Sequence, residues 1–322
     1  MRRHFARLSL VLSLATPAVA SDFRLAQPID CVIGQDCHIQ QYVDHDPSEG
    51  ARDFRCGTLS YDTHTGTDFA LPDLTAMARG VDVLAAAPGF VVGLRDGMAD
   101  RYLTEENRAE IEGRGCGNGV ALRHEDGWET RYCHLKQGSI TVQTGDRVEQ
   151  GAVLGQVGLS GFTQFPHLEL VVEKDGAIVD PFDTDGAATC NGPKPSLWGD
   201  PLPYAPGGLI SVGFSDRIPD YADIKAGSAD LSPLTADAPA LVLWAYAWGS
   251  QPDDILQLEI TGPNGPFTSH TATLERTQAQ FFRATGKRLN TASWPSGAYH
   301  GTATLIRQGA ALDSATLTMT IP

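Results

Sequence analysis

The sequence predicts an all-β protein in which a small antiparallel β-sheet is followed by an immunoglobulin-like β-sandwich. From residue 56 to about residue 182, short runs of β-forming residues are bounded by Gly, Asp and Pro. A stretch rich in Gly, Pro and Asp follows at 183–208, and strand patterns return over 209–322. We therefore expect an N-terminal extension at 21–55, a β-domain at 56–182, a linker at 183–208 and the sandwich at 209–322.

The expected strands of the first β-domain are short, at residues 81–84, 89–94, 119–123, 129–135, 153–157 and 168–173. The turn residues Glu125, Asp126 and Gly127 predict a hairpin between 120–124 and 128–135. The acidic segment 96–115 interrupts the strand pattern, and we expect either a short helix or a loop. Such an insertion is either a wall of a binding groove or a solvated loop.

The C-terminal part has the pattern of a sandwich and no sign of catalysis. Strands are expected at 240–247, 255–260 and 301–306, and a turn is expected at 262–265. This part contains no cysteine and no obvious catalytic cluster. By elimination we assign it to binding or scaffolding.

The first 20 residues have the pattern of a secretory signal peptide. Arg2, Arg3 and Arg7 precede the apolar run 8–14, and Ala-Val-Ala at 18–20 is a small-residue cleavage signature. The alternative is a buried N-terminal helix. No cysteine follows the signature, so we expect an exported protein without a membrane anchor.

The chain is strongly acidic. Removing the signal segment takes away three arginines and no acid, which changes the formal net charge from −15 to −18. Phosphate binding needs a basic surface, so this charge argues against a nucleic-acid partner and against binding to anionic lipid. It suits a substrate that carries free amines.

Six cysteines in an exported chain predict disulfides. Fifteen connectivities are possible, and Cys31–Cys37 and Cys116–Cys133 are plausible local pairs. A metal cluster of cysteines is not expected, because the sequence has no Cys-x-x-Cys. We expect the extension at 21–55 to be irregular and tied down by Cys31 and Cys37.

Three histidines and two carboxylates have the spacing of a metal site. His64 and Asp68 flank Thr-Gly-Thr, a poor helix former, so a bent strand could bring both side chains to one ion. His167 and Glu169 are two apart in an expected strand and share a face, and His134 ends another strand. Imidazole and carboxylate are zinc ligands. The alternative is that each histidine is an isolated, hydrogen-bonded residue.

In combination these motifs resemble the lysostaphin/LytM-type zinc endopeptidases, which cut peptide cross-bridges of bacterial peptidoglycan. The family pattern is His-x-x-x-Asp, a later His-x-His, and a further His on a strand between them. His64-Thr-Gly-Thr-Asp68, Tyr-Cys-His134-Leu and the glycine-rich stretch 145–161 match it, as does Ala-Ala-Pro-Gly-Phe-Val at 86–91. The resemblance covers residues 56–182 and implies a small half-barrel peptidase domain. For an exported chain it also implies a location in the periplasm or at the cell wall.

The resemblance also implies a role for each residue. His64 and Asp68 would ligate Zn²⁺, and His134 and His167 would flank the metal-bound water. The third ligand would be the second His of His-x-His, where this chain has Glu169. Glutamate is itself a zinc ligand, but two carboxylates should make the metal a weaker Lewis acid. The implied reaction is hydrolysis of a peptide bond, with His134 or His167 taking the proton or stabilising the oxyanion.

Two other functions compete with this one. A catalytically silent relative would bind peptidoglycan or act as a regulatory partner of the wall-hydrolysis machinery, and Glu169 is a step in that direction. The glycine frame at 145–158 also resembles a biotinyl or lipoyl carrier domain. A carrier needs a lysine at a hairpin tip, and Lys136 lies outside such a motif.

Overall fold

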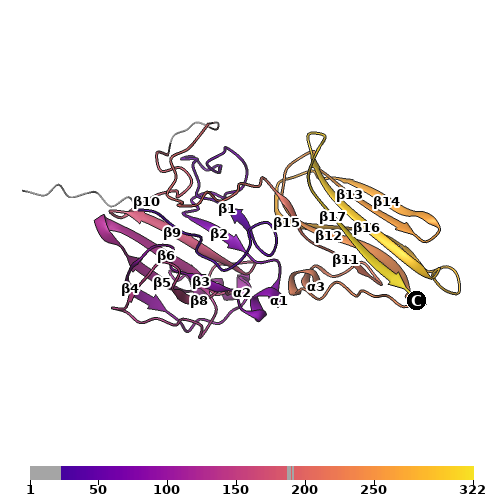
Figure 1. Cartoon of the computed structure of the whole chain (residues 1–322), viewed down its shortest axis with the longest axis horizontal. Helices are drawn as coiled ribbons and strands as arrows, with labels where there is room; N and C mark the ends of the chain where they lie inside the picture. The colour runs from indigo at the N-terminus through magenta and orange to yellow at the C-terminus, as the bar shows by residue number, and fades with distance from the viewer. Residues whose placement is uncertain (1–22, 187–189, 191) are drawn as a thin grey trace, which may run out of the picture.

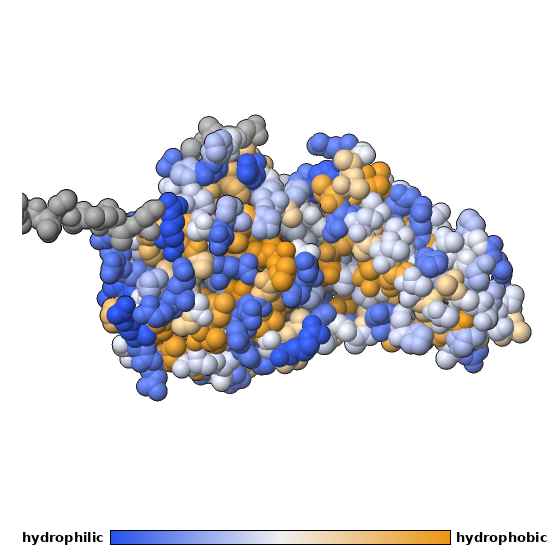
Figure 2. All heavy atoms as spheres, viewed as in Figure 1, coloured by the Kyte–Doolittle hydropathy of each residue, from blue (hydrophilic) through white to orange (hydrophobic). Residues whose placement is uncertain are grey.

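The computed structural model describes residues 23–186, 190 and 192–322, so the predicted signal peptide lies outside the described residues. The described chain is built mainly of β-strands and forms two lobes with a notch between them (Figures 1 and 2). The three α-helices described are α1 (Leu74–Arg79), α2 (Glu105–Ile111) and α3 (Tyr221–Ala226). Within these ranges, no helix has the length and apolar character needed to cross a membrane.

The N-terminal lobe is an antiparallel sheet with a small second sheet beside it. The large sheet has the order β1-β2-β9-β6-β5-β4-β7, with β10 paired to β9. Its strands are β1 (His38–Gln41), β2 (Gly66–Ala70), β4 (Gly89–Arg95), β5 (Asn118–Arg123), β6 (Trp128–Leu135), β7 (Arg147–Val148), β9 (His167–Lys174) and β10 (Ala177–Ile178). The small sheet pairs β3 (Asp82–Leu84) with β8 (Val153–Gln156).

The expected strands of this lobe are confirmed, but the expectation that 21–55 is irregular is wrong at residues 38–41, because these residues form β1 and pair with β2. All six predicted strand runs are present, and β5 and β6 form the predicted hairpin around the short turn η1 (Glu125–Gly127). The interrupting segment 96–115 contains α2, which begins after the cap residue Thr104. The disulfides Cys31–Cys37 and Cys116–Cys133 are confirmed, and the third bond joins Cys56 to Cys190.

The core of this lobe is made from more of the chain than its central sheet. Phe69, Leu168, Leu170 and Tyr132 point to one face of the sheet and are fully buried. Residues before and after the expected β-domain join the same core, at Leu25, Ile29, Ile39, Tyr42, Leu197 and Trp198. Each large buried side chain contributes about 1.5–3 kcal/mol. The expected boundaries at 55/56 and 182/183 remain predictions, but residues on both sides of each share this core.

The C-terminal lobe is the expected sandwich. One sheet has the order β11-β12-β15 and the other the order β14-β13-β16-β17, which is an immunoglobulin-like arrangement. Its strands are β11 (Gly208–Ser215), β12 (Ala240–Ser250), β13 (Ile255–Gly262), β14 (Gly265–Thr273), β15 (Gln278–Arg288), β16 (Gly297–Arg307) and β17 (Ala310–Ile321). The predicted turn at 262–265 joins β13 to β14.

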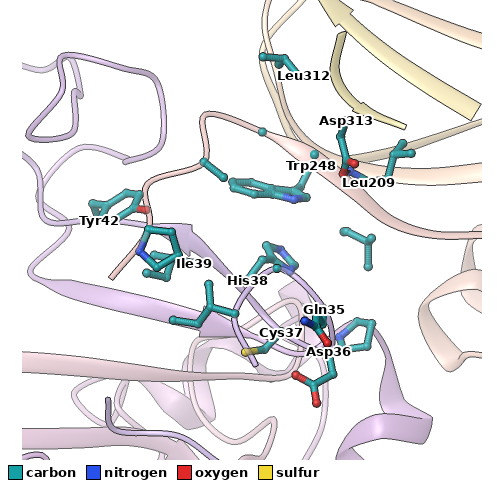
Figure 3. A pocket seen from close by; sticks show the side chains of 18 residues that line it. Gln35, Asp36, Cys37, His38, Ile39, Tyr42, Leu209, Trp248, Leu312 and Asp313 are labelled. Carbon is teal, nitrogen blue, oxygen red and sulfur yellow. The ribbon is translucent and has the colours of Figure 1, made fainter. Parts of the chain in front are cut away.

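Strand β1 forms part of the contact between the lobes. The ring of His38 lies 4.7 Å from the ring of Trp248 on β12. Gln40 donates to the carbonyl of Ala279 at 2.8 Å and accepts from Gln280 at 3.2 Å. A cavity of about 270 Å³ lies at this contact, and the side chains of His38 and Trp248 are among those that line it (Figure 3). Residues 38–41 therefore connect the central sheet to the sandwich.

Acidification should weaken the folded protein through His38. Burial lowers the pKa of His38 to about 4, against 6.5 for the exposed residue, although its hydrogen bond to Gln40 opposes the shift. Between these values the unfolded chain binds more protons than the folded chain. The stabilisation present at neutral pH is therefore lost as the pH falls from about 6.5 towards 4, by at most about 3 kcal/mol.

The measurement is the free energy of unfolding in urea across this pH range, for the wild type and for His38→Gln. The variant should show a shallower pH dependence, because its side chain does not titrate. Parallel curves for the two proteins would contradict the assignment.

Candidate metal centre

Two adjacent strands bring the two carboxylates together, and a third strand lies beside them. In the register of the sheet, Asp68 on β2 lies opposite Glu169 on β9, and Glu169 lies opposite Cys133 on β6. Paired residues point to the same face of a sheet, and His167 shares that face with Glu169 because it is two residues away. The opposite face carries the core residues Phe69 and Leu168. Because side chains alternate between the two faces along β9, the polar site and the core lie on opposite faces of the sheet.

His134 reaches this face through an irregularity in β6. The register between β5 and β6 shifts between Asn118 and Val120, the mark of a bulge or similar irregularity, which can redirect a side chain. His134 has a φ of 65°, in the left-handed region that non-glycine residues seldom occupy. Its amide donates to the carbonyl of Cys116 at 2.8 Å, and Cys116 is bonded to Cys133. The disulfide therefore braces the backbone at this strained residue.

Backbone carbonyls hold all three imidazoles. The Nδ1 atom of His64 lies 2.8 Å from the Tyr42 carbonyl, and that of His134 lies 2.7 Å from the Ser160 carbonyl. The Nδ1 atom of His167 lies 2.8 Å from the Phe165 carbonyl. A carbonyl only accepts, so Nδ1 carries the proton in each ring. In its neutral form each histidine therefore presents an Nε2 lone pair.

The Nε2 atoms converge on the two carboxylates. His64 Nε2 lies 3.2 Å from Asp68 Oδ1 and 3.7 Å from Glu169 Oε1. His134 Nε2 lies 3.3 Å from Glu169 Oε2, and His167 Nε2 lies 3.8 Å from Asp68 Oδ1. Four of the five side chains are at most 5% exposed, and Glu169 is 14% exposed. The structure thus brings together every site residue that the sequence predicted.

The pKa values of the three histidines shift in different directions. Burial opposes a charge on His64, but Asp68 and Glu169 raise its pKa to about 9. Burial likewise opposes a charge on His134, while its hydrogen bond to Glu169 raises the pKa of that imidazole. Burial lowers the pKa of His167 to about 4 despite the nearby Asp68. A cation entering between the carboxylates must therefore displace a proton from His64.

The donor atoms fit a small divalent cation. His64, Asp68 and Glu169 each offer one atom, and these three atoms lie within 4.8 Å of one another. Ligands about 2.1 Å from a tetrahedral zinc ion are about 3.4 Å apart, close to the 3.2 and 3.7 Å separations measured from His64 Nε2. His64 Nε2 and Asp68 Oδ1 are buried and make no hydrogen bond to any described residue. A cation would satisfy both atoms.

A second grouping of donors does not offer a comparable site. Cys31, Asp36 and Cys37 also lie close together. Both of these sulfurs are used in the disulfide Cys31–Cys37, and a thiol must be free and deprotonated to ligate a metal.

The residues that orient the histidines were missed by sequence reasoning. Tyr42, Ser160 and Phe165 act through main-chain carbonyls, which leave no signal in the sequence. Thr163 also contacts His167, with its Oγ1 3.0 Å from Nδ1 and 2.7 Å from the Phe165 carbonyl. Thr163 contacts His167 through its side chain and lies four residues before it, so a residue pattern could have pointed to this partner.

Comparison with known proteins places the site within a known family. Residues 62–181 match the model of peptidase family M23. The DD-carboxypeptidase/endopeptidase Mpg of Neisseria meningitidis is 33% identical over 120 residues, which are 37% of this chain and 22% of that protein. The peptidoglycan DD-endopeptidase ShyA of Vibrio cholerae is 33% identical over 111 residues, 34% of this chain and 20% of that protein. The chain thus spans about a fifth of the length of these curated relatives.

Two solved structures are also similar to parts of the chain. The catalytic domain of the prophage-encoded M23 protein EnpA of Enterococcus faecalis is 26% identical, with a TM-score of 0.30, over 44% of this chain and 88% of that one. The catalytic domain of lysostaphin from Staphylococcus simulans is 25% identical, with a TM-score of 0.27, over 37% and 76% of the two chains.

The position of Glu169 should depend on the absence of a side chain at Gly66. A Cβ at Gly66 would lie 2.5 Å from Glu169 Cγ and 2.8 Å from Oε1, closer than carbon atoms pack. Gly66→Ala should push the carboxylate away from His64 and weaken metal affinity by about 10- to 100-fold, the usual effect of disturbing support around a ligand. Competition with a chromophoric chelator measures the affinity.

Gly93→Ala in β4 is the matched control, because a Cβ there would meet no atom within 4 Å. It should bind metal like the wild type. Equal affinity in the two variants would show that the close approach of Gly66 to Glu169 has no part in metal binding.

Proposed function

Because residues 62–181 are a peptidase family M23 domain, we propose that this protein is an exported zinc-dependent endopeptidase that hydrolyses peptide bonds in bacterial peptidoglycan. The observation that carries the proposal is the convergence of three oriented Nε2 atoms and two carboxylates on one buried point. The names of the relatives Mpg and ShyA support the substrate class. The three disulfides support export, since such bonds persist in oxidising compartments.

His64, Asp68 and Glu169 would hold the zinc ion. A bound Zn²⁺ polarises a carbonyl and lowers the pKa of water. The protein's part is to fix these three donors on two neighbouring strands and on the residues just before β2. Two carboxylates in the set leave less positive charge at the site than one carboxylate and two imidazoles would.

His134 and His167 would move the proton. Their rings lie 4.5 Å apart, and each neutral ring presents its Nε2 lone pair to the centre. The neutral ring takes a proton from the attacking water and passes it to the leaving amine, while the other ring, once protonated at Nε2, donates from that atom to the developing oxyanion. The Phe165 ring stacks on His167 at 4.4 Å and shields that imidazole.

Glu169 would contact both a metal ligand and a proton-transfer histidine. Its Oε1 faces His64, and its Oε2 lies 3.3 Å from His134 Nε2. A carboxylate in this position stabilises the protonated form of His134. A histidine in place of Glu169 could not supply that negative charge, so this chain would operate with a more basic His134.

Exchanging Glu169 tests the ligand assignment. Glu169→Ala should weaken zinc binding by removing one of three donors, whereas Glu169→His should keep or strengthen it by supplying the softer imidazole. The binding constant for zinc, measured by calorimetry on the mature protein, compares these variants with the wild type. Equal affinity in all three would exclude Glu169 as a ligand.

Replacing the other two histidines tests the division of labour. His134→Ala and His167→Ala should each lower cleavage by ~10²-fold or more, with little change in zinc content, because they act on the proton. His64→Ala should lose both zinc and activity. The assay is digestion of purified muropeptides, with metal content measured on the same samples.

Two results would overturn parts of this proposal. Release of zinc by His134→Ala would make that residue a ligand and not a base. A wild type that binds peptidoglycan and zinc but cleaves no wall peptide would establish the silent relative in place of the enzyme.

A further inference from the structure

A lysine of the C-terminal sandwich lies against a tyrosine of the N-terminal lobe. The Lys225 ammonium, on α3, is 4.2 Å from the centre of the Tyr102 ring and 5.2 Å from the centre of the Tyr221 ring. These three residues are called the clamp below. Burial lowers the pKa of Lys225, so its ammonium is partly removed from water. Such cation–π contacts are stronger when the cation is desolvated.

The clamp lies where the two lobes meet through their helices. Helices α1 and α3 are in contact and lie side by side in Figure 1. Thr75 on α1 donates from its hydroxyl to the carbonyl of Ala226 at 2.9 Å. The sandwich therefore has a fixed point on the N-terminal lobe from which Lys225 reaches Tyr102.

Tyr102 belongs to a segment, residues 97–103, that is tied to another part of the lobe. Leu103 donates its amide to the Thr163 carbonyl at 2.9 Å, and Arg101 donates to the Leu159 carbonyl at 3.1 Å. Asp100 accepts from the amide of Leu159 at 2.7 Å. These bonds run between residues 100–103 and residues 158–163, which are called the orienting segment below.

The orienting segment holds both histidines that we assign to proton transfer. The Ser160 carbonyl is the partner of His134 Nδ1, and the Thr163 hydroxyl lies 3.0 Å from His167 Nδ1. Ser160 and Thr163 are both buried. A continuous series of contacts along the chain thus leads from Lys225 through Tyr102 to the two imidazoles.

We infer that the C-terminal sandwich positions the proton-transfer histidines of the N-terminal lobe, through the contact of Lys225 with Tyr102 and the bonds of residues 100–103 to the orienting segment. This inference deepens the proposed function and rests on it for the role of the histidines. Lys225 and Tyr102 are positioning residues, since neither contacts the site. The sandwich, which the sequence assigned to binding or scaffolding only by elimination, thereby gains a role in catalysis.

The test removes the cation and keeps the side-chain length. Lys225→Met should lower kcat/KM for muropeptide cleavage by about three- to tenfold, the scale of one desolvated cation–π contact. Zinc content should not change. Lys225→Arg keeps a cation over the rings and should restore activity. Lys287→Met is the matched control, because Lys287 lies 4.9 Å from the centre of the Phe267 ring within the sandwich, and it should behave like the wild type.

A second readout does not need activity. Amide hydrogen exchange at Arg101, Leu103 and Leu159 should quicken in Lys225→Met and stay unchanged in Lys287→Met. The imidazole ¹⁵N shifts of His134 and His167 should change in the same variant, because their Nδ1 partners move. Tyr102→Leu should reproduce both effects, and the double variant with Lys225→Met should add little to either single change.

The outcomes separate this inference from the proposed function. A wild type without cleavage would defeat the proposed function, and the exchange and ¹⁵N measurements would still decide whether the clamp supports the orienting segment. Exchange rates, imidazole shifts and kcat/KM that are the same in Lys225→Met and Lys287→Met would overturn the inference, whatever the wild type cleaves.

Discussion

The site depends on one constraint, which is that backbone carbonyls hold the Nδ1 atoms of three buried histidines. Once Tyr42, Ser160 and Phe165 fix those atoms, the Nε2 atoms have to share a small space with Asp68 and Glu169. Buried polar atoms without partners are costly, so the arrangement is balanced only when positive charge enters the cluster. Protonation of His64 supplies that charge in one state, and a divalent cation supplies it in another. The sheet around the cluster keeps these groups from relaxing apart.

Glu169 changes the character of this cluster as well as its charge. A carboxylate has two oxygens that point in different directions, and here one faces His64 while the other faces His134. An imidazole at the same position offers one donor atom to the centre once its other nitrogen is used for support. The carboxylate can therefore link the metal ligands to a proton-transfer group directly, at the cost of a more negative site. A glutamate at position 169 is therefore compatible with a working centre.

Much of the fold follows from local patterns, and much of the site does not. The strand runs, the turn at Glu125–Gly127 and the pairing of Cys116 with Cys133 are local, so the sequence predicts them. The five site residues were predicted because their types and spacings are specific in combination. The irregularity in β6 that redirects His134 arises from pairing with β5, and the partners of the imidazoles are main-chain atoms from distant loops. Neither the irregularity nor these partners leave a pattern in the sequence, because every type of residue has a main-chain carbonyl. The core contributions of Leu25 and Trp198 were missed for a similar reason, since isolated apolar residues in irregular segments have no periodicity.

The Tyr42 carbonyl, which accepts from His64, has a consequence for how this domain can be inherited. The stretch that matches the family begins at residue 62, whereas the carbonyl that fixes His64 belongs to Tyr42, and strand β1 at residues 38–41 pairs with β2 beside Asp68. A gene fragment limited to residues 62–181 would therefore encode every donor atom of the centre while leaving the first imidazole free to rotate. Recombination that transplants residues 62–181 must bring the segment that contains Tyr42 along, or the recipient must supply an equivalent acceptor. In this chain the segment needed to hold the site residues in place is longer than the segment that matches the family model.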